Sequence, residues 1–135
     1  MAKLKELQDN LNKLWASIIE KQVIDIFNHF ILFEIKSINN GEVSFHQLKF
    51  NNVKSIYYIN DQLPFEPEED DYLELTSVLF EKERTNEIKV SSKSKEYSYL
   101  TSNSNFLIEI WGRELLIEAS SVEIDGKLFE VGFTA

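Results

Sequence analysis

Apolar and polar residues alternate along most of this chain, which is the pattern of half-buried β-strands. Three pairs that suit two-residue turns separate these runs, namely Asn40-Gly41, Gly112-Arg113 and Asp125-Gly126. Such turns predict the cross-strand pairs Ile31 with Phe50, Phe33 with Leu48, Ile35 with His46, Phe106 with Ala119, Ile108 with Ile117, Ile110 with Leu115, and Val122 with Phe129. A slip of one residue would invert the faces each time, so the matched apolar faces predict antiparallel hairpins.

The N-terminal segment has the period of a helix instead. Apolar residues recur there at spacings of three and four, and Trp15 widens the stripe that is formed by Leu4, Leu7, Leu11, Leu14 and Ile18. We predict an amphipathic helix over about residues 3–17 that covers one side or one open end of a sheet. A coiled-coil or partner helix is the alternative, but the stripe is shorter than three heptads.

Between this helix and the first strong turn, two interpretations stay open. A tight turn at Asn28-His29 would pair Ile26 with Ile31 and Ile24 with Phe33, whereas the alternative is one long strand from Val23 to Ile38. Further along, breaks in the alternation predict a bulge or corner at Asn51-Asn52 and a bulge at Ser120-Ser121.

These elements predict one domain spanning residues 1–135, with a β-rich region over about 18–133. The predicted class is α+β and mainly β: the helix is followed by a hairpin meander of about eight strands in a curled antiparallel sheet or a partly closed barrel. An open flat sheet would leave long edges exposed to aggregation.

Charge narrows the choice of partner. The chain has 23 acidic and 14 basic residues and a formal net charge of −9, which argues against nucleic acid and membrane phosphates and suits a basic protein. The other explanation of the acidic composition is that it only keeps the protein soluble.

The absence of cysteine excludes disulfides and thiolate chemistry, and no cofactor is predicted. No apolar leader precedes the helix, so we expect a cytoplasmic protein.

The densest charge lies in residues 61–75, which contain seven acids, no base and both prolines. This composition predicts a loop. The spacing of its acids matches no calcium-binding loop, so no metal site is predicted. A solvated loop is one interpretation, and the other is a docking surface for a basic protein made of Glu66, Glu68, Glu69, Asp70, Asp71 and Tyr72.

The sequence offers little for catalysis. His29 is predicted at a turn, and His46 is predicted as a hydrogen-bonded structural histidine on a strand. Glu109 and Glu118 are predicted to be neighbouring surface residues, so a hydrolase built on carboxylates is the weakest hypothesis.

A small-molecule site inside a barrel, lined by Tyr58, Tyr99 and Trp111, is the alternative to protein binding.

Several segments together resemble the small YxiG-like proteins of Bacillus and related bacteria. The resemblance rests on the order of the N-terminal helix, Leu48-Lys49-Phe50-Asn51-Asn52-Val53, Asp71-Tyr72-Leu73-Glu74-Leu75-Thr76-Ser77, Ile110-Trp111-Gly112 and Leu116-Ile117-Glu118-Ala119. Members of that family are often encoded among toxin genes, so the resemblance implies an immunity-type role. It carries over no functional residue.

Our hypothesis from the sequence is therefore a non-enzymatic module that binds and neutralises a basic toxin domain. A homo-oligomer is a further possibility, because an edge strand such as Glu87 to Val90 could pair across a two-fold axis.

Overall fold

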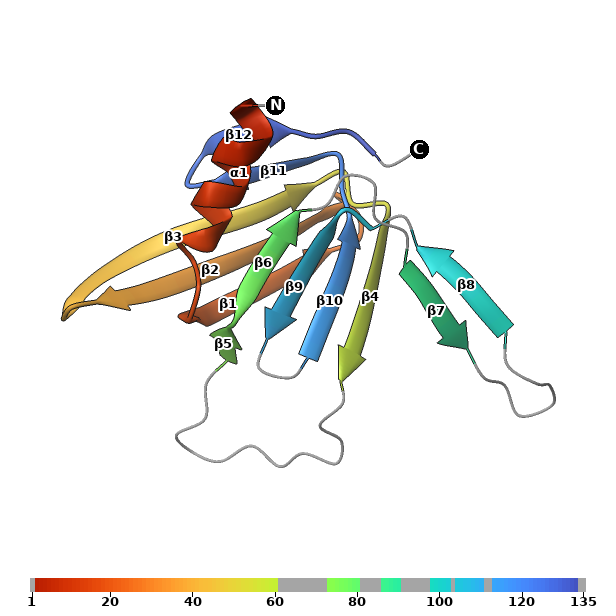
Figure 1. Cartoon of the computed structure of the whole chain (residues 1–135), viewed down its shortest axis with the longest axis horizontal. Helices are drawn as coiled ribbons and strands as arrows, with labels where there is room; N and C mark the ends of the chain where they lie inside the picture. The colour runs from red at the N-terminus through yellow and green to blue at the C-terminus, as the bar shows by residue number, and fades with distance from the viewer. Residues whose placement is uncertain are drawn as a thin grey trace.

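The computed structural model describes residues 2–60, 73–80, 86–90, 98–102, 104–110 and 113–133. This part contains one helix and twelve strands (Figure 1). They are α1 (Ala2–Asn12), β1 (Ser17–Asp25), β2 (Phe30–Asn39), β3 (Glu42–Asn51), β4 (Ser55–Asn60), β5 (Leu73–Leu75), β6 (Ser77–Phe80), β7 (Asn86–Val90), β8 (Ser98–Ser102), β9 (Phe106–Ile110), β10 (Arg113–Glu118), β11 (Ser121–Ile124) and β12 (Lys127–Glu130).

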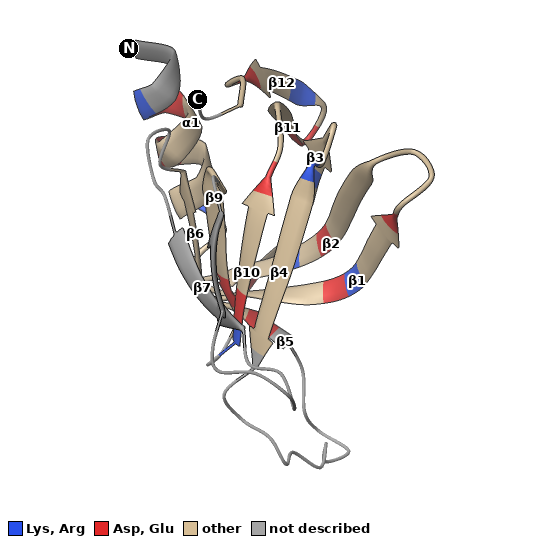
Figure 2. Ribbon diagram, turned by 90° about the vertical axis from the view of Figure 1, so that its right-hand side faces the viewer, with Lys and Arg blue, Asp and Glu red and all other residues tan. Residues whose placement is uncertain are grey.

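The strands form two main antiparallel sheets. The larger sheet has the order β12-β11-β3-β2-β1-β5 and the smaller has the order β4-β10-β9-β6, while β7 and β8 pair separately. Figure 2 shows the two main sheets as distinct layers. Aromatic rings join these layers in the core, where Phe50 of the larger sheet meets Phe106 of the smaller one with ring centroids 4.9 Å apart. Both side chains are buried, so the alternating apolar faces meet inside.

A bent pair of strands links the two sheets. The β3–β11 ladder ends with Asn51 opposite Ser121, and the β4–β10 ladder begins with Ser55 opposite Glu118. Between these two pairs, the three residues 52–54 face the two residues 119–120, which is a one-residue bulge. Asn52 adopts a positive φ of 51° at this corner. The breaks predicted at Asn51-Asn52 and Ser120-Ser121 lie at this single corner.

The helix is shorter than the predicted 3–17. Leu7, Leu11 and Leu14 are buried as predicted, but α1 ends at Asn12 and a positive φ of 60° at Ala16 redirects the chain into β1. Ile18 therefore lies on a strand. Trp15 is 70% exposed, so the prediction that it widens the buried stripe is wrong.

Helix α1 also covers an open edge of the smaller sheet. The Gln8 side chain donates from Nε2 to the Val78 carbonyl at 3.0 Å and accepts the Phe80 N–H at 2.9 Å. It thereby bonds the free edge of β6 as a neighbouring strand would, and an exposed edge is avoided.

Two of the predicted hairpins have the predicted register. Asn40-Gly41 and Asp125-Gly126 have positive φ at both residues, as type I′ turns require, and Phe33 pairs with Leu48 while Val122 pairs with Phe129.

The other two hairpins differ from the prediction by two residues. The β1–β2 connection has four residues, 26–29, so Ile24 pairs with Ile31; the single long strand from Val23 to Ile38 is wrong. In the β9–β10 hairpin Arg113 is already part of β10 and pairs with Ile110, so Ile117 pairs with Phe106; the backbone of Ala119 is bonded by the Asn105 side chain instead. A shift of two leaves each side chain on its predicted face.

At the coarse level the predicted fold class is confirmed, since the chain is mainly antiparallel β with one short helix. The count of about eight strands is wrong, and the described strands form separate sheets without closing into a barrel. None of the described helices is long and apolar enough to cross a membrane.

Glu118 is a further correction, because it was predicted on the surface and is only 5% exposed. Its Oε1 accepts a hydrogen bond from the Ser55 hydroxyl at 3.0 Å. Leu107 and Leu116, on the same face of the smaller sheet, are buried as well. Alternation reveals which residues share a face, but it does not reveal whether that face is covered.

Candidate protein-binding site

Strands β2 and β3 form a hairpin that extends beyond its neighbours. Strand β11 pairs with β3 only over residues 48–51, so among the described strands only β2 lies beside the remainder of β3 towards the turn. Figure 1 shows this hairpin reaching outward past α1. Residues 38–45 are all exposed, which makes the tip of the hairpin a protruding surface.

One face of the protruding tip is apolar. Ile38, Val43 and Phe45 are 54%, 51% and 70% exposed. Ile38 is directly opposite Val43 in the ladder, and Phe45 lies two residues further along the same strand, so all three side chains share a face. We call these three residues the hairpin patch. Clustered exposed apolar side chains commonly mark interaction sites, whereas single ones do not.

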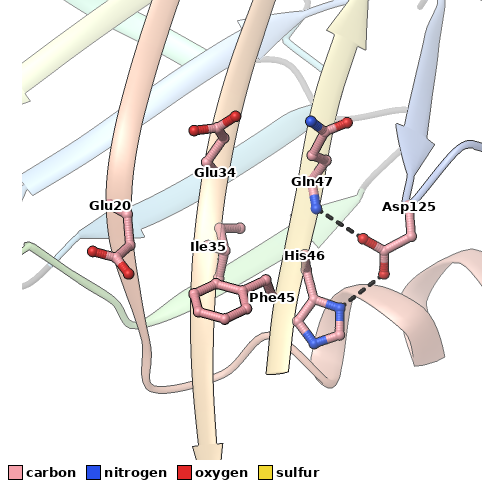
Figure 3. A pocket seen from close by; sticks show the side chains of 7 residues that line it. All are labelled: Glu20, Glu34, Ile35, Phe45, His46, Gln47 and Asp125. Atoms are coloured by element: carbon pink, nitrogen blue, oxygen red, sulfur yellow. Dashed lines mark hydrogen bonds and ion pairs between the residues drawn. The ribbon is translucent and has the colours of Figure 1, made fainter. Parts of the chain in front are cut away.

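An acidic cleft borders the hairpin patch. It is an open cleft of about 560 Å³ that is lined by Glu20, Glu34, Ile35, Phe45, His46, Gln47 and Asp125 (Figure 3). Its three carboxylates come from β1, β2 and the β11–β12 turn, and no lysine or arginine is among these lining residues. We call it the acidic cleft.

Two of these carboxylates are available to a ligand. Glu20 lies where the β1–β2 register shifts, between Ile19 and Lys21, and Glu34 lies on β2. Within the described part of the chain, no hydrogen bond or ion pair involves either carboxylate. Lys21 and Lys36 lie opposite Glu34 and Phe45 in the ladders, and Figure 2 shows this mixture of acids and bases along β1 and β2.

Asp125 is held in place by its neighbours. Its Oδ1 accepts the Gln47 N–H at 2.8 Å, and its own N–H donates to the Gln47 carbonyl at 2.9 Å. Its Oδ2 lies 2.8 Å from Nδ1 of His46, whose Nε2 is 3.1 Å from the Ser44 hydroxyl. The β11–β12 turn thus substitutes for a strand beside Gln47 and fixes the wall of the acidic cleft.

Ser44, His46 and Asp125 are connected in the order of a hydrolytic triad. The hydroxyl lies on an exposed strand rather than inside a closed cleft, and the carboxylate also accepts a backbone N–H. We therefore interpret this network as a structural lock between β3 and the β11–β12 turn. His46 is hydrogen-bonded, as its strand position predicts.

Most of the residues predicted for binding are outside the part of the chain that the structure describes. Glu66, Glu68, Glu69, Asp70, Asp71 and Tyr72 fall outside the described residues, as do Trp111 and the side chain of Tyr99. Tyr58 lies on the edge strand β4, where it pairs with Leu115 and is mostly exposed. It lines neither the acidic cleft nor a smaller cleft of about 250 Å³ between the β1–β2 turn and the start of β4.

The residues of the acidic cleft were missed because they are far apart in sequence. Glu20, Glu34 and Asp125 each occur singly within a strand or turn pattern, where an acid normally indicates only a solvated position. Phe45 carried a weak signal, because it falls on the polar face of the alternation that places Leu48 and Phe50 inside.

A protein-family model matches most of the chain. The model of the family described as YxiG-like protein matches residues 7–129 of the chain, which include the hairpin patch and every residue of the acidic cleft. No curated protein matches the chain.

Proposed function

The chain belongs to the YxiG-like protein family, and on this premise we propose that it is a non-enzymatic, cytoplasmic module that binds a basic protein domain. The role we propose is of the immunity type, in which binding neutralises a bacterial toxin domain. The observation that carries the proposal is the position of exposed Phe45, which belongs both to the hairpin patch and to the acidic cleft.

This combination suits a partner that presents a basic side chain beside an apolar surface. Binding energy in protein interfaces concentrates in aromatic and arginine side chains that become fully desolvated. Phe45 supplies the aromatic anchor, and Ile38 and Val43 enlarge the apolar contact. An arginine or lysine of the partner would then reach Glu20 and Glu34, whose carboxylates have no partner among the described residues.

The net charge of the chain also favours a basic partner. At −9 the chain attracts a basic domain over distances of about the Debye length, ~8 Å at physiological salt, and this attraction raises the association rate. Binding that depends on it weakens as salt is raised. We propose that the acidic segment Glu66, Glu68, Glu69, Asp70, Asp71 with Tyr72 adds to this attraction and forms a second contact.

The test is affinity capture from the lysate of the native organism, with variants that discriminate among surfaces. The bait is the wild type, and the binding variant combines Phe45→Ser with Glu34→Gln. The matched control combines Leu128→Ser with Glu130→Gln, which likewise replaces one large apolar and one acidic side chain, at exposed positions of β12.

We expect a basic protein to be captured by the wild type and the control, to be lost by the binding variant, and to be released as salt is raised. Equal capture by all three baits would refute the role of the hairpin patch and the acidic cleft. A captured protein that is acidic, or that is retained equally at high salt, would refute the electrostatic part of the proposal.

A further inference from the structure

Part of strand β3 has one edge without a neighbour among the described strands, which we call the free edge. One edge of β3 pairs with β2 along residues 42–50, while the other edge pairs with β11 only from Leu48 onward. At Gln47 the β11–β12 turn provides the bonds, since its backbone N–H and carbonyl both bond Asp125. No described strand lies beside residues 42–46 on that edge.

The ladder shows which backbone groups this edge presents. In an antiparallel pair, alternate residues direct N–H and C=O towards the same neighbouring strand. Because Gln47 directs both groups away from β2, Phe45 and Val43 do so as well, whereas Ser44 and His46 bond β2. The free edge therefore presents the N–H and carbonyl of Val43 and of Phe45.

We propose that a second copy of this chain occupies the edge, with residues 42–46 of the two copies paired antiparallel about a two-fold axis at Ser44. In this register Val43 lies opposite Phe45 of the partner subunit, and the reverse pair follows by symmetry. Both members of each pair present free backbone groups, so the register forms four interchain hydrogen bonds. Shifting it by two residues towards the β11–β12 turn would place Val43 opposite the occupied groups of Gln47.

The side chains of the segment complement themselves in the same register. On the face of the hairpin patch, each Val43 meets an aromatic ring, which is a favourable cross-strand pair. On the opposite face, each Glu42 lies opposite His46 of the partner subunit, and the two Ser44 residues lie opposite each other at the axis. The segment also lacks the lysine and proline that commonly prevent edge pairing.

Self-pairing would join the two hairpin patches into one continuous apolar surface, because the patch residues lie on one face of the extended sheet. The inference goes beyond the proposed function and does not rest on it, since the backbone edge is free whether or not a basic partner binds. The effect of salt distinguishes self-pairing from the binding of a basic partner. Added salt weakens the capture of a basic partner, whereas it screens the repulsion between two chains that each have a net charge of −9 and so favours self-pairing.

Sedimentation equilibrium from low micromolar to millimolar protein tests the pairing. Val43→Pro removes an edge N–H that β2 does not use, and Phe45→Lys places a charge on the edge. The control is Ile38→Lys, which adds the same charge to the same face but on β2, outside the strand edge that is proposed to pair. Thermal melts confirm that each variant is folded.

We expect a concentration-dependent wild-type dimer, weakened at least about tenfold by Val43→Pro and by Phe45→Lys and less by Ile38→Lys. Amide exchange gives a second readout: the Val43 and Phe45 N–H groups become protected only at dimer concentrations, whereas those of Ser44 and His46 are protected throughout.

Three results would overturn the pairing. They are a monomeric wild type at every concentration, a dimer that Val43→Pro leaves intact, and a dimer in which the Val43 and Phe45 amides exchange freely. A dimer that only Ile38→Lys breaks would show stacking of two faces and would also overturn it.

Discussion

Asn105 supports the corner between β10 and β11 with its side chain. It is only 1% exposed, and its Nδ2 donates to the Ala119 carbonyl at 2.8 Å while its Oδ1 accepts the Ala119 N–H at 3.1 Å. Ala119 is fully buried and belongs to no strand, so the ladder does not satisfy these two backbone groups. Nδ2 also donates to the Gly132 carbonyl at 3.2 Å.

Replacing Asn105 with Ala would leave both backbone groups of Ala119 buried without a partner. An unsatisfied buried group costs about 1–3 kcal/mol, so the free energy of unfolding should fall by about 2–6 kcal/mol. Gly132 is exposed and its carbonyl can bond water instead, so it adds little. Small domains are stable by only about 5–15 kcal/mol, and the variant should therefore lose a large fraction of its stability.

Equilibrium urea unfolding measures this loss. The control is Asn51→Ala, because that amide makes one half-buried hydrogen bond of 3.0 Å, to Glu123. The control should lose about 1 kcal/mol. A loss for Asn105→Ala that is below about 1 kcal/mol, or that equals the loss of the control, would show that other groups satisfy Ala119 and would refute the reasoning.

Three further predictions concern the helix and the first hairpin. Ala16→Gly should stabilise the protein by about 1 kcal/mol in urea unfolding, because Ala16 has a φ of 60° that costs a side chain about that much; destabilisation would contradict this. Gln8→Ala should cost about 2 kcal/mol and accelerate exchange of the Phe80 amide, because both bonds to the β6 edge are lost; an unchanged amide would contradict it. Hydrogen bonds from the side chain and backbone of Asn28 hold the pKa of Asp25 below its ordinary value of 3.8. The ionised Asp25 carboxylate therefore stabilises the folded protein above pH 3.8, and this stabilisation is lost as the pH falls through the lower pKa of the folded state. The difference in the free energy of unfolding between wild type and Asp25→Asn should then shrink in acid; a constant difference would contradict this.

Hairpins were the most predictable part of the fold, because turn chemistry is local. The positive φ values of Asn40, Gly41, Asp125 and Gly126 follow from residue type, and the register follows from the turn. Where the turn signal was weak or ambiguous, around Asn28-His29 and Gly112-Arg113, the register was wrong by two residues while the faces were right.

Long-range features could not be predicted in the same way. The hydrogen bonds between Asn105 and Ala119 end the β9–β10 ladder, and nothing near either residue indicates this contact. The helix end at Asn12 depends on Ala16 adopting a conformation that its residue type disfavours. The burial of Glu118 depends on what covers the second face of the smaller sheet.

The candidate site was unpredictable for the same reason. Its acids come from positions 20, 34 and 125, and only the bulge in β1 and the β11–β12 turn bring them to one cleft. The free edge of β3 also depends on where β11 stops, which no single strand pattern shows.

Site-specific photocrosslinking in the native organism tests most directly whether the β2–β3 hairpin is the interaction surface. A photoreactive phenylalanine analogue would replace Phe45 in one variant and Phe27 in a control, since Phe27 is the same residue type on the β1–β2 turn and is more exposed than Phe45. We expect adducts from position 45 with a basic protein and with a second copy of the chain, and none from position 27. Adducts from position 27 alone, or from neither position, would contradict it.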